Sequence, residues 1–221
     1  MAKIKDRIIE EAKRLFTEKG YDQVSLRGIA QAAGTTIGNL TYHFPQKEDL
    51  IEEIQKDIQT FFLKEMTTII ETGGYSVEGL VHLLVMAQSS QEGASFYFSN
   101  MVELCKNFEP IAKNTIIFRQ RLFEYLVKCF GALKAEGLLR GDIKPRQYET
   151  LAYIIVMMAT FWIQNHSLYY DPDLPKIGLT QAASDLLRPY FTDIGLDDYE
   201  KVQARYLRYE LPGTTVSRPL S

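Results

Sequence analysis

A run of residues between positions 36 and 42 carries the groups that read the edges of DNA bases. An asparagine amide pairs with adenine, a threonine offers a hydroxyl and a methyl group, and an isoleucine can meet the methyl group of thymine. A glycine lets the backbone come close to another molecule. On a short helix, the outward residues would be Thr36, Ile37, Gly38, Asn39, Thr41 and Tyr42. These residue types predict a helix that reads DNA.

Residues that can hold phosphate groups stand on both sides of this run. Backbone N–H groups at a helix N-terminus attract anions, and cationic, hydroxyl and imidazole groups bond phosphate oxygens. The residues that offer or cap such groups are Ser25, Arg27, Thr36, Tyr42, His43 and Lys47. We expect them to position the protein on the DNA backbone.

The elements that must position these residues are two short helices, predicted at 26–33 and 36–42. Ser25 and Thr36 suit the N-cap positions, and Gly34 permits the left-handed backbone conformation of a tight turn. Two helices so joined form a helix-turn-helix, whose second helix lies in the major groove. The alternative is a helical hairpin of small residues with no role in DNA binding.

The charge distribution supports contact with a polyanion at the N-terminus only. The 221-residue chain has a net charge of −3. Residues 1–47 hold eight Lys and Arg against five Asp and Glu, whereas the remaining 174 residues hold 17 against 23. A small basic end on an acidic body would direct the N-terminus toward nucleic acid.

Glycines and prolines divide the chain into helix-length segments. After a first helix that ends at Gly20, the apolar spacing and the capping residues Ser76 and Thr180 predict further helices, at about 47–72, 76–89, 110–137, 145–169 and 180–191. An aromatic-rich segment spans 93–108 and a loop spans 171–178, and there is no strand or hairpin signal. The sequence predicts an all-α protein with a helix-turn-helix domain at 1–47, a larger helical domain at 48–210 and a disordered tail at 211–221.

Four motifs near the N-terminus occur together in a fixed order. They are Phe16-x-x-x-Gly20-Tyr21, SLRGIAQAAG at 25–34, GNLTYHF at 38–44 and KEDL at 47–50. This segment resembles the DNA-binding domain of the TetR family of bacterial transcriptional regulators. Thr35 and Thr41 depart from the aliphatic and aromatic residues that the family often has there, so the base preference of another member cannot be transferred.

The resemblance implies a homodimer that binds a roughly palindromic DNA operator, and most members of the family repress transcription. It also implies that the domain at 48–210 binds a small ligand that weakens DNA binding. Pockets between helices are mostly apolar with a few polar groups, so we expect a hydrophobic or aromatic effector. The candidate lining residues are Tyr97, Phe98, Met101, Phe118, Tyr125, Met158, Trp162 and His166, with His82 as a further possibility. The alternative for these side chains is plain hydrophobic core.

The resemblance further implies dimerisation through a four-helix bundle built from the last two major helices, at about 145–169 and 179–191. Small residues would let these helices approach closely, and leucines would supply contact area. The predicted interface residues are Ala152, Ala159, Ala182, Ala183, Leu186 and Leu187.

Other classes of protein fit the sequence less well. No phosphate-binding loop, GxSxG, HExxH or CxxC motif is present, so we expect no enzyme, cofactor or metal site. The apolar run 151–163 is shorter than the roughly 20 residues of a membrane span, and the N-terminus lacks a signal peptide, so we expect a cytoplasmic protein. Cys105 and Cys129 suggest small buried thiols. A protein of the same fold whose larger domain binds a protein partner remains the alternative function.

Overall fold

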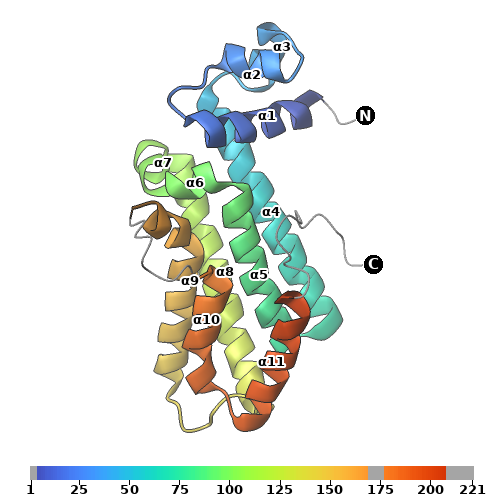
Figure 1. Cartoon of the computed structure of the whole chain (residues 1–221), viewed down its shortest axis with the longest axis vertical. Coiled ribbons are helices and arrows are strands. Elements are labelled where there is room, and N and C mark those ends of the chain that lie inside the picture. The colour runs from blue at the N-terminus through green and yellow to red at the C-terminus, as the bar shows by residue number, and fades with distance from the viewer. Residues whose placement is uncertain (1–3, 169–176, 208–221) are drawn as a thin grey trace.

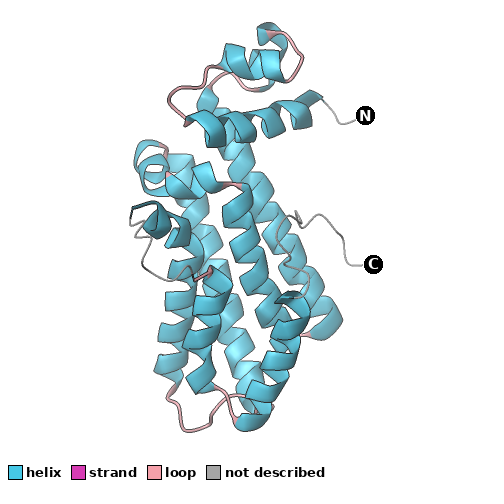
Figure 2. Ribbon diagram, in the orientation of Figure 1, coloured by secondary structure: helices cyan, strands magenta, loops and turns pink. Residues whose placement is uncertain are grey.

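The chain folds into helices throughout the residues that the structure, a computed structural model, describes, which are 4–168 and 177–207 (Figures 1 and 2). The elements are α1 Ile4–Lys19, α2 Leu26–Ala32, α3 Ile37–His43, α4 Lys47–Gly73, α5 Val77–Gly93, α6 Ser95–Ser99, α7 Met101–Asn107, α8 Glu109–Ala135, α9 Pro145–Leu168, α10 Leu179–Leu187, the 3-10 turn η1 Arg188–Tyr190 and α11 Asp193–Leu207. Within these ranges a single β-bridge, between Leu139 and Phe191, accompanies the helices. The predicted all-α class is confirmed.

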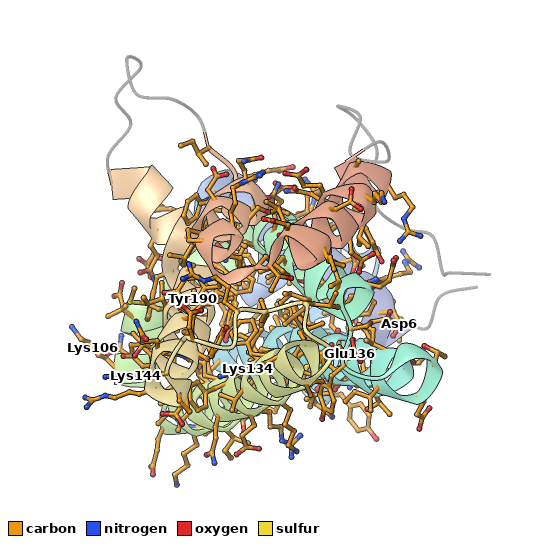
Figure 3. All side chains as sticks on the ribbon, turned by 90° about the horizontal axis from the view of Figure 1, so that it is seen from below. Asp6, Lys106, Lys134, Glu136, Lys144 and Tyr190 are labelled. Atoms are coloured by element: carbon orange, nitrogen blue, oxygen red, sulfur yellow. The ribbon has the colours of Figure 1, made fainter. Side chains whose placement is uncertain are left out.

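The three short N-terminal helices sit at one end of an elongated bundle of long helices. In Figure 1, α1, α2 and α3 form the upper end, and α4 runs from them down the side of the bundle. Helices α5, α8, α9, α10 and α11 complete the bundle, and side chains fill the space between them in Figure 3. Because α4 belongs to both ends, it connects them mechanically.

The hydrophobic core has two parts. The first, which we call the head core, joins α1–α3 to the first turns of α4 and includes Phe16, Leu40 and Ile54. It also takes in α6, α7 and the start of α8, through residues such as Phe96 and Ile111. The second, the body core, fills the bundle of long helices. The head core therefore extends well past residue 47. The domain boundary at that residue stays a prediction.

The predicted helix caps are confirmed at three positions and wrong at a fourth. The side chains of Ser25, Thr36 and Ser76 accept hydrogen bonds from backbone N–H groups three residues later. Thr180 does not cap α10, which begins at Leu179 after Gly178. The backbone N–H of Thr180 donates instead to the side chain of Gln88 on α5, at 3.0 Å. A tertiary contact thus supplies the cap.

One further expectation is corrected, and the structure defines two segments that the sequence left open. The aromatic-rich segment at 93–108 is two short helices, α6 and α7, and the helix predicted to reach residue 191 ends at Leu187. Helix α11, which no pattern predicted, begins at Asp193 after Thr192, whose hydroxyl accepts from the Gly195 N–H at 3.2 Å. The tail at 211–221 and most of the loop at 171–178 lie outside the described residues.

The apolar run 151–163 lies in α9. Part of it, including Leu151 and Ile155, is buried in the body core. Across the described part of the chain, no helix combines the length and hydropathy that a membrane span requires. Both thiols are free, Cys129 buried and Cys105 half-buried.

Candidate nucleic-acid interface and core cavity

Helix α3 presents an outward face that matches the predicted reading residues. Tyr42 is 82% exposed and Ile37 is 43% exposed, which is unusual for large apolar side chains. Thr36 and Gly38 are also exposed, and a Cβ atom on Gly38 would meet nothing within 4 Å. Leu40 points the other way, into the head core. The buried face fixes α3 and leaves its other face free for a partner.

The turn before α3 is held from α1 by an arginine. Gly34 adopts a φ of +62°, and the Thr35 N–H donates back to the carbonyl of Ala30 at 2.9 Å. The guanidinium of Arg7 donates to the carbonyl of Ala33 at 2.6 Å. A Cβ atom on Gly34 would lie 2.7 Å from that guanidinium. Arg7 was not among the predicted residues, because nothing in the sequence shows that α1 crosses the turn.

Gly34→Ala is expected to loosen the helix-turn-helix by about 1–2 kcal/mol, because it adds left-handed strain and displaces Arg7. Hydrogen exchange of the amides in residues 26–43 measures the loss. Gly38→Ala is the matched control. It fills empty space in a helix and should stabilise by up to about 1 kcal/mol. Equal effects of the two changes would contradict this account of the turn.

Besides the capping residues Ser25 and Thr36, three of the predicted contact residues already bond within the protein. The side chain of Asn39 donates to the Thr35 hydroxyl at 2.8 Å, and the Thr41 hydroxyl donates to the Ile37 carbonyl at 3.0 Å. The ammonium of Lys47 donates to the Tyr21 carbonyl at 2.8 Å and lies 4.2 Å from the centre of the Tyr21 ring. These residues position the unit as well as facing outward. The predicted contact residues that are exposed are Ser25, Arg27, Thr36, Ile37, Gly38, Tyr42 and His43.

A small apolar cavity lies inside the body core. Its volume is about 30 Å³, room for little more than a water molecule. Its walls come from α4, α5, α6, α8 and α9, and every lining residue is apolar: Ile58, Phe62, Leu83, Leu84, Ala87, Phe98, Phe118, Leu122, Leu126, Ile155, Val156 and Ala159. Any ligand accommodated here must meet apolar surface and must push side chains aside.

The predicted pocket residues scatter around this cavity. Phe98 and Phe118 line it, whereas Trp162 lines a separate open hollow. Tyr97 and Met101 are buried in the head core, and Met158 packs against the body core. The side chain of His166 lies outside the described residues.

Tyr125 lies on α8 and His82 lies on α5. The Tyr125 hydroxyl is buried without a hydrogen-bond partner among the described residues, and burial raises its pKa. The Nδ1 atom of His82 lies 3.1 Å from the Tyr206 hydroxyl of α11, and its Nε2 atom lies 3.6 Å from Oε2 of Glu65. Burial lowers the pKa of His82. Neither residue lines the cavity.

A buried polar cluster joins α4, α6 and α8. Gln55 of α4 is fully buried, and its amide nitrogen lies 2.9 Å from the Tyr97 hydroxyl, 3.0 Å from the Ile111 carbonyl and 2.9 Å from the Thr115 hydroxyl. Asn114 approaches its oxygen at 3.4 Å. Burial raises the pKa of Tyr97 to about 12, while hydrogen bonds with Thr115 and Gln55 act in the opposite direction. The cluster ties α4 to α6 and α8 with neutral groups.

Helix α6 touches three parts of the molecule through three consecutive residues. Phe96 packs on Phe16 of α1, with ring centres 5.1 Å apart. Tyr97 bonds to Gln55 of α4, and Phe98 lines the cavity. Helix α6 therefore contacts α1, α4 and the cavity through neighbouring residues.

Two family models together match most of the chain. The model described as "Bacterial regulatory proteins, tetR family" matches residues 8–54, and the model described as "Bacterial transcriptional repressor" matches residues 52–199. The chain belongs to the TetR family. Its TetR-family relatives include the probable HTH-type transcriptional regulator YttP of Bacillus subtilis, which is 34% identical over 203 residues, spanning 85% of this chain and 86% of YttP.

Solved TetR-family structures share the whole fold. A transcriptional regulator from Marinobacter aquaeolei VT8 superposes with a TM-score of 0.77 at 19% identity, over 92% of this chain and 98% of the other. A γ-butyrolactone receptor described as ArpA-like gives 0.62 at 19% identity, over 93% and 97%. At these identities the similarity establishes the architecture, from the helix-turn-helix through the helical bundle.

Half of the residues predicted for the TetR-family dimer interface are buried inside the protomer. Ala152, Ala183 and Leu187 are fully buried in the body core, and Ala159 lines the cavity. Ala182 and Leu186 are partly exposed. The three buried residues expose no surface for a partner, because small and apolar residues serve a protomer core as well as they serve an interface.

Proposed function

We propose that the protein is a dimeric, cytoplasmic repressor that binds a palindromic operator and leaves it when a small hydrophobic effector enters the bundle. The outward face of α3, from Thr36 to Tyr42 on a clamped helix-turn-helix, carries the proposal. Its hydroxyl, methyl and aromatic groups can reach base edges, while Ser25, Arg27 and His43 lie beside it for phosphates. The proposal places the DNA-reading domain at residues 1–47. It assigns ligand binding and dimerisation to the helical domain at residues 48–210.

Two copies are needed because one short helix reads too few base pairs for specificity. Two recognition helices held about 34 Å apart would enter successive major grooves on one side of the duplex. The net positive charge of residues 1–47 would draw this end toward DNA, and the acidic remainder of the chain would keep the bundle away from it.

The exposed apolar face of α9 is the dimer surface in this proposal. Tyr153 is 58% exposed and Met157 is 42% exposed, and they lie one helical turn apart. Leu186 of α10 is also partly exposed, and α10 packs beside α9. The proposed surface lies on the same helices that the sequence predicts for the dimer. It uses the exposed Tyr153 and Met157 in place of the buried residues of that prediction.

Met157→Glu should convert the dimer to monomers at micromolar concentration, because it places a charge in an apolar interface. Analytical ultracentrifugation measures the change, and operator affinity should fall with it. Ile194→Glu is the matched control, since Ile194 is 75% exposed on α11. A Met157→Glu protein that stays dimeric would show that the protomers meet elsewhere.

The apolar walls of the cavity favour a hydrophobic effector. A carboxylate or ammonium group among these twelve side chains would lose its hydration without gaining a partner. The γ-butyrolactone receptor, by its name, binds an uncharged lactone, which is consistent with this class. Because the cavity is small, the effector would have to enlarge it, and enlargement is what would transmit the signal.

The signal would travel through α6 and α4. An effector that displaces Phe98 would move Tyr97 and Phe96, and so act on Gln55 in α4 and on Phe16 in α1. Since α4 begins directly after the helix-turn-helix, its movement would change the separation of the two recognition helices. The effector acts only as far as it binds the released form more tightly than the DNA-bound form.

Selection of bound sequences from a random duplex pool at physiological salt tests the proposal. We expect a palindromic motif whose half-sites are centred about one helical turn apart, or a multiple of it. The selection is run twice, the second time with protein that has been unfolded, washed and refolded to remove any bound effector. Failure to recover a motif in both selections would contradict the proposal.

A further inference from the structure

The side chain of Gln91 bridges α5 and α9 through the backbone of α9. Gln91 is only 2% exposed. Its amide nitrogen donates to the Ala159 carbonyl at 2.9 Å and approaches the Met158 carbonyl at 3.4 Å, and its amide oxygen accepts from the Ile163 N–H at 2.9 Å. One side-chain amide thus serves three backbone groups of a neighbouring helix.

These backbone groups include a pair that an α-helix would normally join. In a regular helix the N–H of residue 163 donates to the carbonyl of residue 159. The Gln91 amide binds both partners of this pair. Insertion of a side chain into this ladder is a known cause of helix bending. Seen along the long axis in Figure 3, the last turns of α9 run sideways out of the bundle, and in Figure 1 they lean away from α5.

Gln91 lines one hollow and adjoins another. Ala87, one turn before it on α5, and Ala159, whose carbonyl it bonds, line the apolar cavity. Gln91 itself lines an open hollow of about 340 Å³, which we call the vestibule. The described residues that line the vestibule are Gln88, Gln91, Glu92, Trp162, Ile163, Ile177, Gly178 and Leu179. The vestibule offers amide groups, whereas the cavity is wholly apolar.

We propose that Gln91 is a latch between the vestibule and the cavity, and that an amphipathic effector binds across it, with an apolar body in the cavity and an uncharged hydrogen-bonding head at Gln91. If Gln91 swings out, the Ile163 N–H and the Ala159 carbonyl still face each other as helical partners, so α9 loses little. The freed amide then needs a partner, which the head of the ligand supplies. This inference deepens the proposed function and depends on its effector.

The charge of the vestibule selects the head group. Glu92 is the one charged side chain among its described lining residues. An anionic head would therefore meet a like charge without a cation to balance it. A hydroxyl, ketone, ester or amide can both satisfy the Gln91 amide and avoid this repulsion. The site should thus prefer an alcohol to a carboxylate with the same alkyl chain.

The test uses the fluorescence of Trp162, which is the single tryptophan of the sequence and lines the vestibule. The probes are 1-decanol and decanoate, mixed rapidly with the full-length protein. We expect 1-decanol to bind at least about tenfold more tightly than decanoate. In Gln91→Ala, 1-decanol should associate faster, because the latch is gone, and bind about tenfold more weakly, because one hydrogen bond is lost.

Gln203→Ala is the matched control, since Gln203 is a buried glutamine that bonds Ser184 away from α9. It should leave the rate and the affinity for 1-decanol unchanged. If Gln91→Ala does not fold, Gln91→Met keeps the length of the side chain without its hydrogen bonds and gives the same comparison.

Three results would overturn the latch: no response of Trp162 to 1-decanol, tighter binding of decanoate, or a Gln91 variant within twofold of the wild type in both rate and affinity. None of them involves DNA. A protein that fails here but selects a palindromic motif refutes the latch alone. A protein that selects no motif refutes the proposed function, whatever Trp162 reports.

Discussion

Ile37→Glu should reduce operator affinity about 1,000-fold or more. Ile37 is exposed at the N-terminal end of α3, where side chains reach base edges. A carboxylate there would face the negative potential of the groove and lose the contact of the isoleucine. A dimer carries the change twice, so a cost of about 2 kcal/mol in each half-site accounts for this factor. Titration of a labelled operator at fixed salt measures it.

The control for this experiment is Ile194→Glu, which adds the same charge to an exposed isoleucine on α11. Its affinity should stay within threefold of the wild type. Because Leu40 and not Ile37 anchors α3 in the head core, Ile37→Glu should leave the thermal stability unchanged. An operator affinity within threefold for Ile37→Glu would mean that α3 does not face the groove.

Gln55→Leu should lower the free energy of unfolding by about 2–3 kcal/mol, because it removes the centre of the buried polar cluster. The Thr115 hydroxyl can still donate to the Ile111 carbonyl, at 2.8 Å, but the Tyr97 hydroxyl loses its bond to Gln55. Tyr97→Phe alone should cost about 1 kcal/mol. The double variant should cost less than the sum, since both changes remove the same bond between Gln55 and Tyr97. Urea unfolding of the four proteins gives the cycle.

The same cycle also reports on signal transmission. With α4 and α6 no longer joined by Gln55, an effector that moves α6 should shift operator affinity less than it does in the wild type. Additive unfolding energies would contradict the bonded cluster. A full effector response in Gln55→Leu would show that α4 receives the signal by another route.

The N-terminal unit is the part of the fold that the sequence predicts best. Its helices begin at residues that cap them locally, such as Ser25 and Thr36, and its turn depends on the backbone freedom of Gly34. These are short-range effects, decided within three or four residues. The local pattern therefore predicts the position of the helix-turn-helix. It also predicts which face of α3 is exposed, the face that carries Ile37 and Tyr42.

Three contacts could not be predicted in this way. They are those of Arg7 with the turn, of Gln55 in the buried polar cluster and of Gln91 with α9. Arg7, Gln55 and Gln91 each bond to residues at least 26 positions away in the chain. Glutamine and arginine are most often exposed, so nothing in the local pattern marks these three as buried or structural. Only the packing of the helices brings their partners within reach.

Helix α11 shows a different limit. Its inward residues Tyr199 and Val202 are three positions apart, and its start has the capping residue Thr192. The pattern is present but short, and polar residues separate its few apolar positions. The residues predicted for the dimer show a related limit. Ala152 and Ala183 are buried within the protomer, because residue size does not distinguish packing within a protomer from packing between protomers.

The central claim is that two copies of α3 occupy two major grooves of one operator. A DNA-cleaving iron chelate attached at Gln31→Cys tests it most directly, since Gln31 is exposed on α2 beside the turn. Cys105→Ala in the same protein removes the half-buried native thiol. Cleavage of a selected motif should fall in two symmetric clusters about one helical turn, or a multiple of it, apart. Cleavage in a single cluster, or evenly along the duplex, would contradict the claim.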